Sequence, residues 1–271
     1  PESEHADPAQ MVRRWANTPG DSFIVSAYSP SKLSDEYETT LMEENLREEA
    51  YRMFDFDSRH IPESFVQTKV DPWESTFKVD QLPNGVSEED VVDQLKDAGF
   101  TKDREQGDFE VYSRNNTSTT FRAVGQDRHL MVYGPGAEDD QRRNYMNRAL
   151  QQRNQDTYQL TSSGRSVVDV LDVQDSITLW SSESRPVAPG FEGSLNIGAS
   201  TVDFESGSQC EAFAFENEGR AEATYHVLKD EVDQHGFDSI EYQGSSVLTE
   251  EEYDLDELGS TAAHISLPRL L

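Results

Sequence analysis

The stretch Ser87-Glu-Glu-Asp-Val-Val-Asp-Gln-Leu-Lys-Asp-Ala-Gly-Phe100 predicts an amphipathic helix with a defined beginning and a defined end. Ser87 is a preferred N-cap residue, and Asp90 occupies the capping-box position three residues later. The apolar residues that follow recur at helical spacing. Glycine is the usual residue at a left-handed helix stop, so we expect the helix to end at Gly99 and Phe100 to pack back over its last turn.

The same succession of marks occurs twice in the chain. Gly99-Phe100 is followed by a predicted strand, Gln106-Gly107 and a second strand; 137 residues further on, Gly236-Phe237 is followed by a strand, Gln243-Gly244 and another strand. We therefore predict an α+β protein of two related small domains, each an antiparallel sheet with helices packed on one face. Coincidence is the alternative, because glycine followed by an aromatic residue is common where a helix leads into a strand.

The domain boundaries are predicted from composition and periodicity. Residues 1–20, with Pro8, Pro19 and Gly20, are expected to form a flexible N-terminal arm. The other segments are a first α+β domain at residues 21–160, a linker at Thr161-Ser162-Ser163-Gly164 within a second α+β domain at residues 161–258, and a C-terminal tail at residues 259–271. Besides the elements above, the patterns predict strands at residues 22–28, 66–79, 119–124, 130–133, 176–180, 195–204 and 211–215, and helices at residues 35–54, 138–153 and 219–232.

The charge balance indicates adaptation to concentrated salt. The chain has 53 acidic and 23 basic residues and a net charge of -30, and its basic residues are seventeen Arg and six Lys. Molar salt shortens the Debye length to about 3 Å, so dispersed carboxylates cease to repel one another. Aromatic residues, at 10% of the chain and within periodic segments, argue against disorder. Nucleic acid is excluded as a partner because phosphate binding needs clustered cations, so any macromolecular partner is expected to be a protein.

Several features bear on the cellular compartment. The single cysteine, Cys210, rules out an internal disulfide framework, and no apolar segment is long enough to span a membrane. Because the chain begins at Pro1 rather than Met, we expect that an upstream segment was removed, and lipid anchoring upstream of Pro1 stays open. Asn115 and Asn116 begin two overlapping glycosylation sequons at a predicted hairpin tip. These marks favour an extracytoplasmic location, secreted or at the cell surface, with a high-salt cytoplasm as the alternative.

The segment from about residue 76 to 153 resembles a module of uncharacterised haloarchaeal secreted proteins and lipoproteins. The resemblance rests on the helix Ser87–Phe100, on Gly107-Asp-Phe-Glu-Val-Tyr112, on Phe121-Arg-Ala-Val124 and on His129-Leu-Met-Val-Tyr-Gly134. It implies a helix, three strands and a closing helix. It implies no catalytic residues, and the lipobox cysteine of lipoproteins is absent from this sequence.

The sequence contains no recognisable catalytic, cofactor-binding or metal-binding motif. Asp55-Phe-Asp-Ser-Arg-His60 gathers two carboxylates and an imidazole, but it lacks the glycine and terminal glutamate of a calcium loop, so we expect no metal there. Cys210 lies in an alternating apolar stretch that is typical of an inert thiol. The remaining histidines stand apart in sequence. A run of arginines on the helix at residues 138–153 indicates either a docking site for an acidic partner or an ordinary solvated face: Arg142, Arg143, Arg148 and Arg153.

Three functional hypotheses therefore remain after the sequence alone. The first is a non-enzymatic envelope or secreted protein of a halophilic archaeon that acts through surface recognition. The second is a hydrolase-type enzyme whose site is assembled from scattered residues, which a deep pocket with convergent polar groups would favour. The third is a structural protein of a haloarchaeal virus, which a symmetric contact or a large flat patch would favour.

Overall fold

The structure is a computed structural model, and it describes the residues that carry the sheet and its covering helices. The described residues are 7–16, 23–32, 60–69, 76–115, 119–133, 139–152, 161–173, 175–181, 195–203, 206, 208–229 and 238–252. The predicted helix at residues 35–54, the glycine mark at Gly236 and the predicted C-terminal tail lie outside them.

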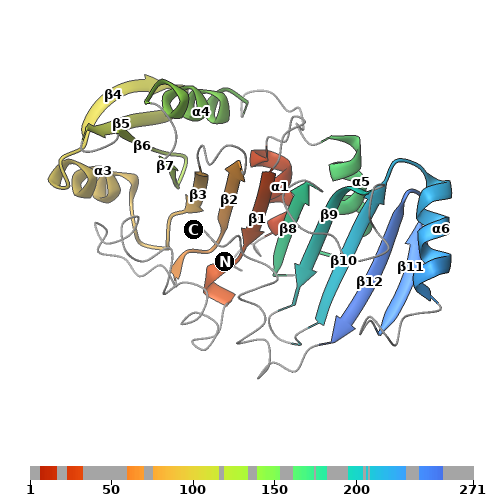
Figure 1. Ribbon diagram of the computed structural model, residues 1–271. Coiled ribbons are helices and arrows are strands. Elements are labelled where there is room, and N and C mark those ends of the chain that lie inside the picture. The colour runs from red at the N-terminus through yellow and green to blue at the C-terminus, as the bar shows by residue number, and fades with distance from the viewer. Residues whose placement is uncertain are drawn as a thin grey trace.

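The described strands form one antiparallel sheet of twelve strands, shown in Figure 1 from β4 at one end to β11 at the other. The order across the sheet is β11-β12-β10-β9-β8-β1-β2-β3-β7-β6-β5-β4. The strands are β1 (Phe23–Tyr28), β2 (Ser64–Lys69), β3 (Thr76–Gln81), β4 (Thr101–Gln106), β5 (Phe109–Asn115), β6 (Thr119–Gly125), β7 (Arg128–Tyr133), β8 (Ser176–Ser181), β9 (Leu195–Val202), β10 (Ser208–Phe215), β11 (Ser239–Gln243) and β12 (Ser246–Glu252). The helices are α1 (Pro8–Trp15), the short 3-10 helix η1 (Pro30–Lys32), α3 (Glu88–Asp97), α4 (Asp139–Gln152), α5 (Ser162–Val170) and α6 (Glu218–Lys229).

The two halves of the chain meet in the middle of this sheet. β1 belongs to the first half and β8 to the second, and they pair antiparallel from Ile24 opposite Trp180 to Tyr28 opposite Ser176. A side-chain hydrogen bond of 3.0 Å between Ser26 and Thr178 joins the same two strands. The prediction of an α+β protein with antiparallel pairing is confirmed, but both halves build one continuous sheet, so two separate domains are not confirmed.

The repeated marks correspond to similar local structures. α3 is followed by the hairpin β4–β5 and α6 by the hairpin β11–β12, and β4 and β11 are the two outermost strands. Gly107 and Gly244 open the two hairpin turns with φ of 61° and 58°. The hairpins differ in their inner neighbours, because β5 pairs with β6 whereas β12 pairs with β10. The duplication thus stays a prediction that the two hairpins support.

Helices cover both faces of the sheet, so the expectation of helices on one face is wrong. Side chains of a strand alternate between the two faces, and this sheet is apolar on both. α1, α4 and α5 pack on the face that carries Val25, Phe65 and Phe77. α3 packs on the opposite face near Tyr112, and α6 packs on that same opposite face at the other end of the sheet. A strand that is buried on both faces carries apolar side chains at odd and at even positions. An alternating pattern of apolar and polar residues describes a strand with only one buried face.

The predicted N-terminal arm contains a helix, which corrects that assignment for the described residues 7–16. Asp7 caps α1 by accepting a hydrogen bond from the backbone of Gln10 at 3.0 Å. Pro8 occupies the first helical turn, where its fixed φ and missing N–H are tolerated. Val12 and Trp15 are buried in the main core. Residues 7–16 are therefore part of the folded body.

The predicted linker is the beginning of α5. The Thr161 hydroxyl accepts a hydrogen bond from the backbone of Gly164 at 3.2 Å and so caps the helix, and Gly164 is buried. The small residues that suggest a flexible linker supply a cap and a close-packed first turn instead.

Helix α3 agrees with its prediction at both ends. The Ser87 hydroxyl accepts from the Asp90 backbone at 3.1 Å, and the Asp90 carboxylate accepts from the Ser87 backbone at 3.0 Å. Gly99 has φ of 86° and ends the helix, and the backbone of Phe100 donates to the Leu95 carbonyl at 2.9 Å. Phe100 and Leu95 are buried in one cluster, so the predicted packing of Phe100 over the helix end is confirmed.

Candidate functional site

A polar cleft of about 520 Å³ opens beside α1, at the ends of three neighbouring strands. Its walls come from α1, from the residue before β2, and from the facing ends of β3 and β7. The lining residues are Asp7, Gln10, Met11, Arg14, Glu63, Gln81 and Arg128. Its volume lies in the usual range for sites that hold small organic molecules.

The strand ends place the floor of the cleft. Gln81 and Arg128 stand opposite each other in the β3–β7 register, and the backbone of Gln81 donates to the Glu63 carbonyl at 2.9 Å. Gln126 and Asp127 both have positive φ, 54° and 56°, as a two-residue type I′ hairpin turn requires. This turn makes Arg128 the first residue of β7 and brings its side chain beside Glu63.

Arg128 is held in an ion pair within the cleft. Its Nη2 and Nη1 atoms lie 3.3 and 3.4 Å from Glu63 Oε2, and both side chains are largely buried. Nη1 also lies 3.8 Å from the sulfur of Met11. The guanidinium of Arg128 is therefore fixed by contacts inside the protein.

Arg14 is the second arginine of the cleft and is exposed. Its guanidinium lies 5.7 Å from the centre of the Trp15 ring. No carboxylate in the described part of the chain forms an ion pair with it. Burial and the nearby charge of Arg128 lower the pKa of Arg14, whereas Glu63 opposes that shift. Arg14 is thus an exposed cation that lies near the charge of Arg128 and lines the cleft.

A second polar cluster lies on the opposite face of the sheet and is buried. Asp80 accepts a hydrogen bond from the Ser64 hydroxyl at 2.7 Å and pairs with Lys78 at 3.2 Å. Arg122 and His129 lie on the neighbouring strands β6 and β7. These five side chains are at most 4% exposed. Because these side chains are almost fully buried, the cluster has a structural role rather than a role in binding from solution.

Burial controls the titration of this cluster. It lowers the pKa of Lys78 and raises that of Asp80, because both charged forms are removed from water, and their mutual attraction works against both shifts. Burial, with the charges of Arg122 and Lys78, holds the pKa of His129 well below its ordinary value. His129 is therefore neutral near pH 7.

The residues that the sequence suggested for chemistry do not gather into one place where they are described. Cys210 is partly buried in β10, and burial, with nearby carboxylates, raises the pKa of its thiol, which disfavours the reactive thiolate. His226 lies on the exposed face of α6, 4.0 Å from Glu222. Asp55 and Asp57 lie outside the described residues, and within those residues no three metal-ligating side chains come together.

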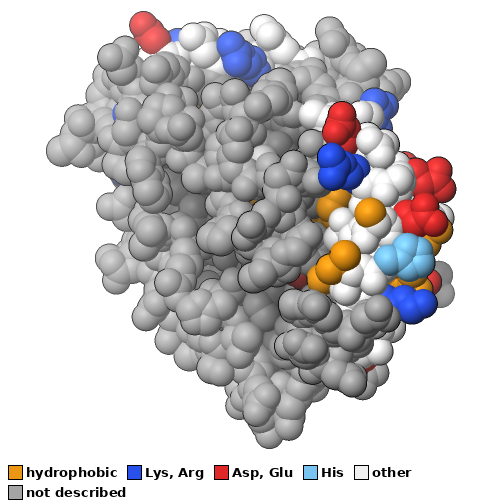
Figure 2. All heavy atoms as spheres, turned by 45° about the vertical axis from the view of Figure 1, so that its right-hand side comes forward, with side chains coloured by type: hydrophobic (Ala, Val, Ile, Leu, Met, Phe, Trp, Pro, Cys, Tyr) orange, Lys and Arg blue, Asp and Glu red, His pale blue; other side chains and the backbone are white. Residues whose placement is uncertain are grey.

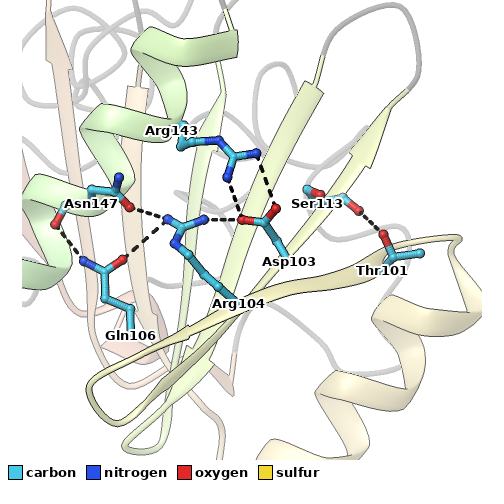
Figure 3. Close-up of polar contacts among 7 residues, drawn as sticks. All are labelled: Thr101, Asp103, Arg104, Gln106, Ser113, Arg143 and Asn147. Atoms are coloured by element: carbon cyan, nitrogen blue, oxygen red, sulfur yellow. Dashed lines mark hydrogen bonds and ion pairs between the residues drawn. The ribbon is translucent and has the colours of Figure 1, made fainter.

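Arg143 of α4 is engaged inside the protein, as Figure 3 shows. Arg143 donates to both carboxylate oxygens of Asp103 at 3.0 and 3.3 Å, and its guanidinium lies 5.2 Å from the centre of the Phe121 ring. Asp103 also pairs with Arg104, which reaches Asn147 on α4. These contacts attach α4 to the edge strand β4.

The remaining α4 arginines differ in their surroundings. Arg142 is buried, Arg148 is exposed, and Arg153 lies outside the described residues. The docking site for an acidic partner is therefore not supported by Arg142 and Arg143, because internal packing and pairing occupy them.

The sequon residues are described in part. Asn115 ends β5 and faces Thr119 of β6 in the hairpin register, as predicted, and Asn116 lies outside the described residues.

The α6 end of the sheet carries a small exposed apolar group. Val227 is 56% and Tyr242 37% exposed, and the Tyr242 ring packs on Tyr225 with 5.1 Å between centroids. Figure 2, turned to bring this end forward, shows apolar, acidic and basic side chains mixed on it. These side chains form a local cluster with charged neighbours rather than a broad apolar patch.

Sequence reasoning missed all seven cleft residues. They come from segments separated by up to about half the chain, and none belongs to a recognisable motif. Only the strand register and the position of α1 bring them together. The composition of residues 1–20 predicts a flexible arm, so the sequence gives no sign that α1 forms a wall of the cleft.

Comparison with known proteins gives a fold and no family. No protein family and no characterised protein matches the chain. Two crystal forms of the spirochete protein TP0453 have a similar structure. Crystal form I has a TM-score of 0.53 at 9% identity over 97% of this chain and 99% of that one, and crystal form IV has a TM-score of 0.52 at 9% identity over 95% and 96%. These similarities show that the chain shares the overall fold of TP0453.

In the described part of the chain no helix is long and apolar enough to cross a membrane.

Proposed function

We propose that the protein is a non-enzymatic recognition protein of a halophilic archaeon, secreted or attached to the cell envelope, and that the cleft beside α1 is its recognition site. The observation that carries the proposal is the convergence of Arg14, Gln10 and Gln81 on an accessible cleft of about 520 Å³. The residues that line this cleft include no Ser, Thr, Cys or His, so its convergent polar groups favour binding over nucleophilic hydrolysis. The cleft has the concave form of a ligand-binding site, and its lining is more polar than is usual for one.

The pattern of ion pairs supports the cleft as a place of recognition. Several described cations are bound to carboxylates: Lys102 reaches Glu105 at 2.7 Å and Glu110 at 2.5 Å, and Lys32 reaches Asp175 at 2.5 Å. Among the described residues Arg14 has no such pair, and neither have Arg148 and Arg220. Of these three arginines, Arg14 is the one that lines the cleft.

A thermal-shift screen tests recognition at the cleft. Organic acids, sugars, amino acids, nucleotides and short peptides are added to the wild type, to Gln10→Trp and to Gln151→Trp, in about 2 M potassium chloride, where screening is nearly complete. Gln10 is an exposed cleft residue whose replacement by indole fills the cleft, and Gln151 is an exposed α4 residue that serves as the control.

The screen has three outcomes. A compound that stabilises the wild type and Gln151→Trp but not Gln10→Trp supports recognition at the cleft. A compound that is recovered chemically converted supports the hydrolase hypothesis instead. If no compound stabilises the wild type, the proposed function is contradicted.

The compartment is tested separately in a halophilic archaeal host. We expect the protein in the envelope or medium fraction, with glycan on Asn115 or Asn116 found by mass spectrometry of peptides. Recovery in the cytoplasm alone, with both asparagines unmodified, would contradict the extracytoplasmic part of the proposal.

A further inference from the structure

We infer that the cleft binds the carboxylate group of an organic ligand and that Arg14 is the residue that holds it. The inference rests on the proposed recognition function and names the class of ligand for the same site. Two sources share this chemistry: a small organic acid, and the C-terminal carboxylate of a peptide.

The charges of the cleft select an anion at Arg14. Asp7 is engaged as the N-cap of α1, and Glu63 is engaged by Arg128. Arg14 has no such carboxylate partner among the described residues, and Arg128 lies close enough to disfavour its charge. An anion bound at Arg14 offsets that repulsion, since it brings a negative charge next to the Arg14 guanidinium.

The same charges favour a carboxylate over a phosphate. A guanidinium offers two parallel N–H groups that match the two oxygens of one carboxylate. Glu63 and Asp7 lie in the same walls, so a dianion meets more repulsion than a monoanion. The side chains of Gln10 and Gln81 add neutral amide donors, which complete the coordination of a singly charged group.

The size and lining of the cleft fit a ligand that is larger than a single small ion. A volume of about 520 Å³ exceeds the space that a single halide or acetate occupies. Met11 contributes an apolar wall to an otherwise polar lining. An organic acid with an apolar body fits this combination, with its carboxylate at Arg14 and its body against Met11.

Isothermal titration calorimetry with matched ligands tests this assignment. Benzoate is compared with benzamide, its neutral counterpart, and with phenyl phosphate, and the peptide Ala-Ala-Phe is compared with its C-terminal amide. All titrations use the same concentration of potassium chloride, about 2 M, because chloride competes for guanidinium groups and screening must be constant. The proteins are the wild type, Arg14→Gln, Gln10→Glu and the control Arg148→Gln, which removes an exposed arginine from α4.

We expect benzoate or Ala-Ala-Phe to bind the wild type at least about tenfold more tightly than its neutral counterpart, as a charge-assisted hydrogen bond predicts. Arg14→Gln and Gln10→Glu should weaken binding by about tenfold or more, and Arg148→Gln should leave it unchanged. Unfolding curves without ligand verify that each variant is folded. Whichever of benzoate and the free peptide binds more tightly identifies the source of the carboxylate.

Each of the following results would overturn the inference. If the charged ligands and their neutral counterparts bind equally well, the cleft does not recognise a carboxylate. If phenyl phosphate binds more tightly than benzoate, the ligand class is a phosphate rather than a carboxylate. If Arg14→Gln and Arg148→Gln lose the same amount of affinity, Arg14 is not the residue that holds the ligand. If all five ligands fail to bind while the screen finds a ligand at the cleft, the carboxylate assignment fails and the recognition function stands. Failure of both experiments removes both proposals.

Discussion

At the scale of single residues, close packing at Gly198 of β9 joins this strand to β8, the strand of the second half that pairs with β1. A Cβ atom at Gly198 would lie 2.4 Å from Cε2 of Trp180, which is itself buried at 3% exposure. The strand around Gly198 is predictable from its periodicity, but its register against Trp180 is not, because alternation alone does not fix which residues stand opposite. The need for glycine at this position follows only from the structure.

We predict that Gly198→Ala lowers the free energy of unfolding by about 1–3 kcal/mol, because the added methyl group forces Trp180 out of its position. The control is Gly219→Ala in α6, whose Cβ would lie 3.5 Å from Asn217 Oδ1. In a helix this change is neutral or stabilising by up to about 1 kcal/mol. Urea unfolding at constant salt measures both, and equal effects would contradict the packing argument.

The buried pair of Lys78 and Asp80 gives a second prediction at this scale. Lys78→Met leaves the Asp80 carboxylate buried without its cation and should cost about 3–5 kcal/mol of unfolding free energy. The double variant Lys78→Met, Asp80→Leu removes both charges and should recover most of that loss. Denaturant unfolding measures the two variants. A double variant no more stable than Lys78→Met would show that the charges are needed for another reason.

At the scale of secondary-structure elements, local capping signals explain what the sequence could and could not predict. The Ser87 and Asp90 box and the Gly99 stop lie within the chain segment that they control, so α3 is predictable at both ends. α1 and α5 carry caps as well, but residues such as Pro8 and Gly164 are also typical of loops and linkers. The choice between a capped helix and a loop at such residues depends on burial of an apolar face, and that burial is supplied by distant strands.

The capping box of α3 predicts a measurable dependence on pH. Hydrogen bonds from the Ser87 hydroxyl and backbone lower the pKa of Asp90 below its ordinary value of 3.8. The folded-state pKa is therefore below the unfolded one, so the stabilisation by Asp90 is present above pH 3.8 and disappears as the pH falls through the lowered pKa.

Ser87→Ala should accordingly cost about 1 kcal/mol at neutral pH. The difference between variant and wild type should shrink as the pH falls through the lowered pKa of Asp90, because the wild-type carboxylate then becomes protonated as well. Urea unfolding at neutral pH and at a pH below the lowered pKa of Asp90 measures this change. A difference that stays constant across them would show that the box does not contribute through Asp90.

At the scale of the whole molecule, charge and topology set the conditions under which the cleft exists. The α+β class and the antiparallel pairing follow from periodicity, whereas the joining of both halves through β1 and β8 has no local signal. The cleft shares this limit, since its parts come from α1 and from the ends of β2, β3 and β7. Both depend on contacts between residues distant in sequence, which neither composition nor spacing encodes.

The net charge of -30 predicts that folding requires salt. Raising potassium chloride from about 0.1 M to several molar shortens the Debye length from about 10 Å to below 3 Å and removes repulsion among carboxylates. The midpoint of thermal unfolding should therefore rise across this range. A midpoint independent of salt would contradict the halophilic assignment.

The central claim is that recognition takes place at the cleft beside α1, and amide hydrogen exchange with benzoate tests it without any substitution. The exchange of the free protein is compared with that of the protein in excess benzoate, both in about 2 M potassium chloride. We predict slowed exchange in α1 and at the ends of β2, β3 and β7 around Glu63, Gln81 and Arg128, because a ligand at Arg14 contacts these segments. No change in excess benzoate would contradict the carboxylate assignment alone. Slowed exchange confined to other segments would contradict the claim that recognition takes place at the cleft.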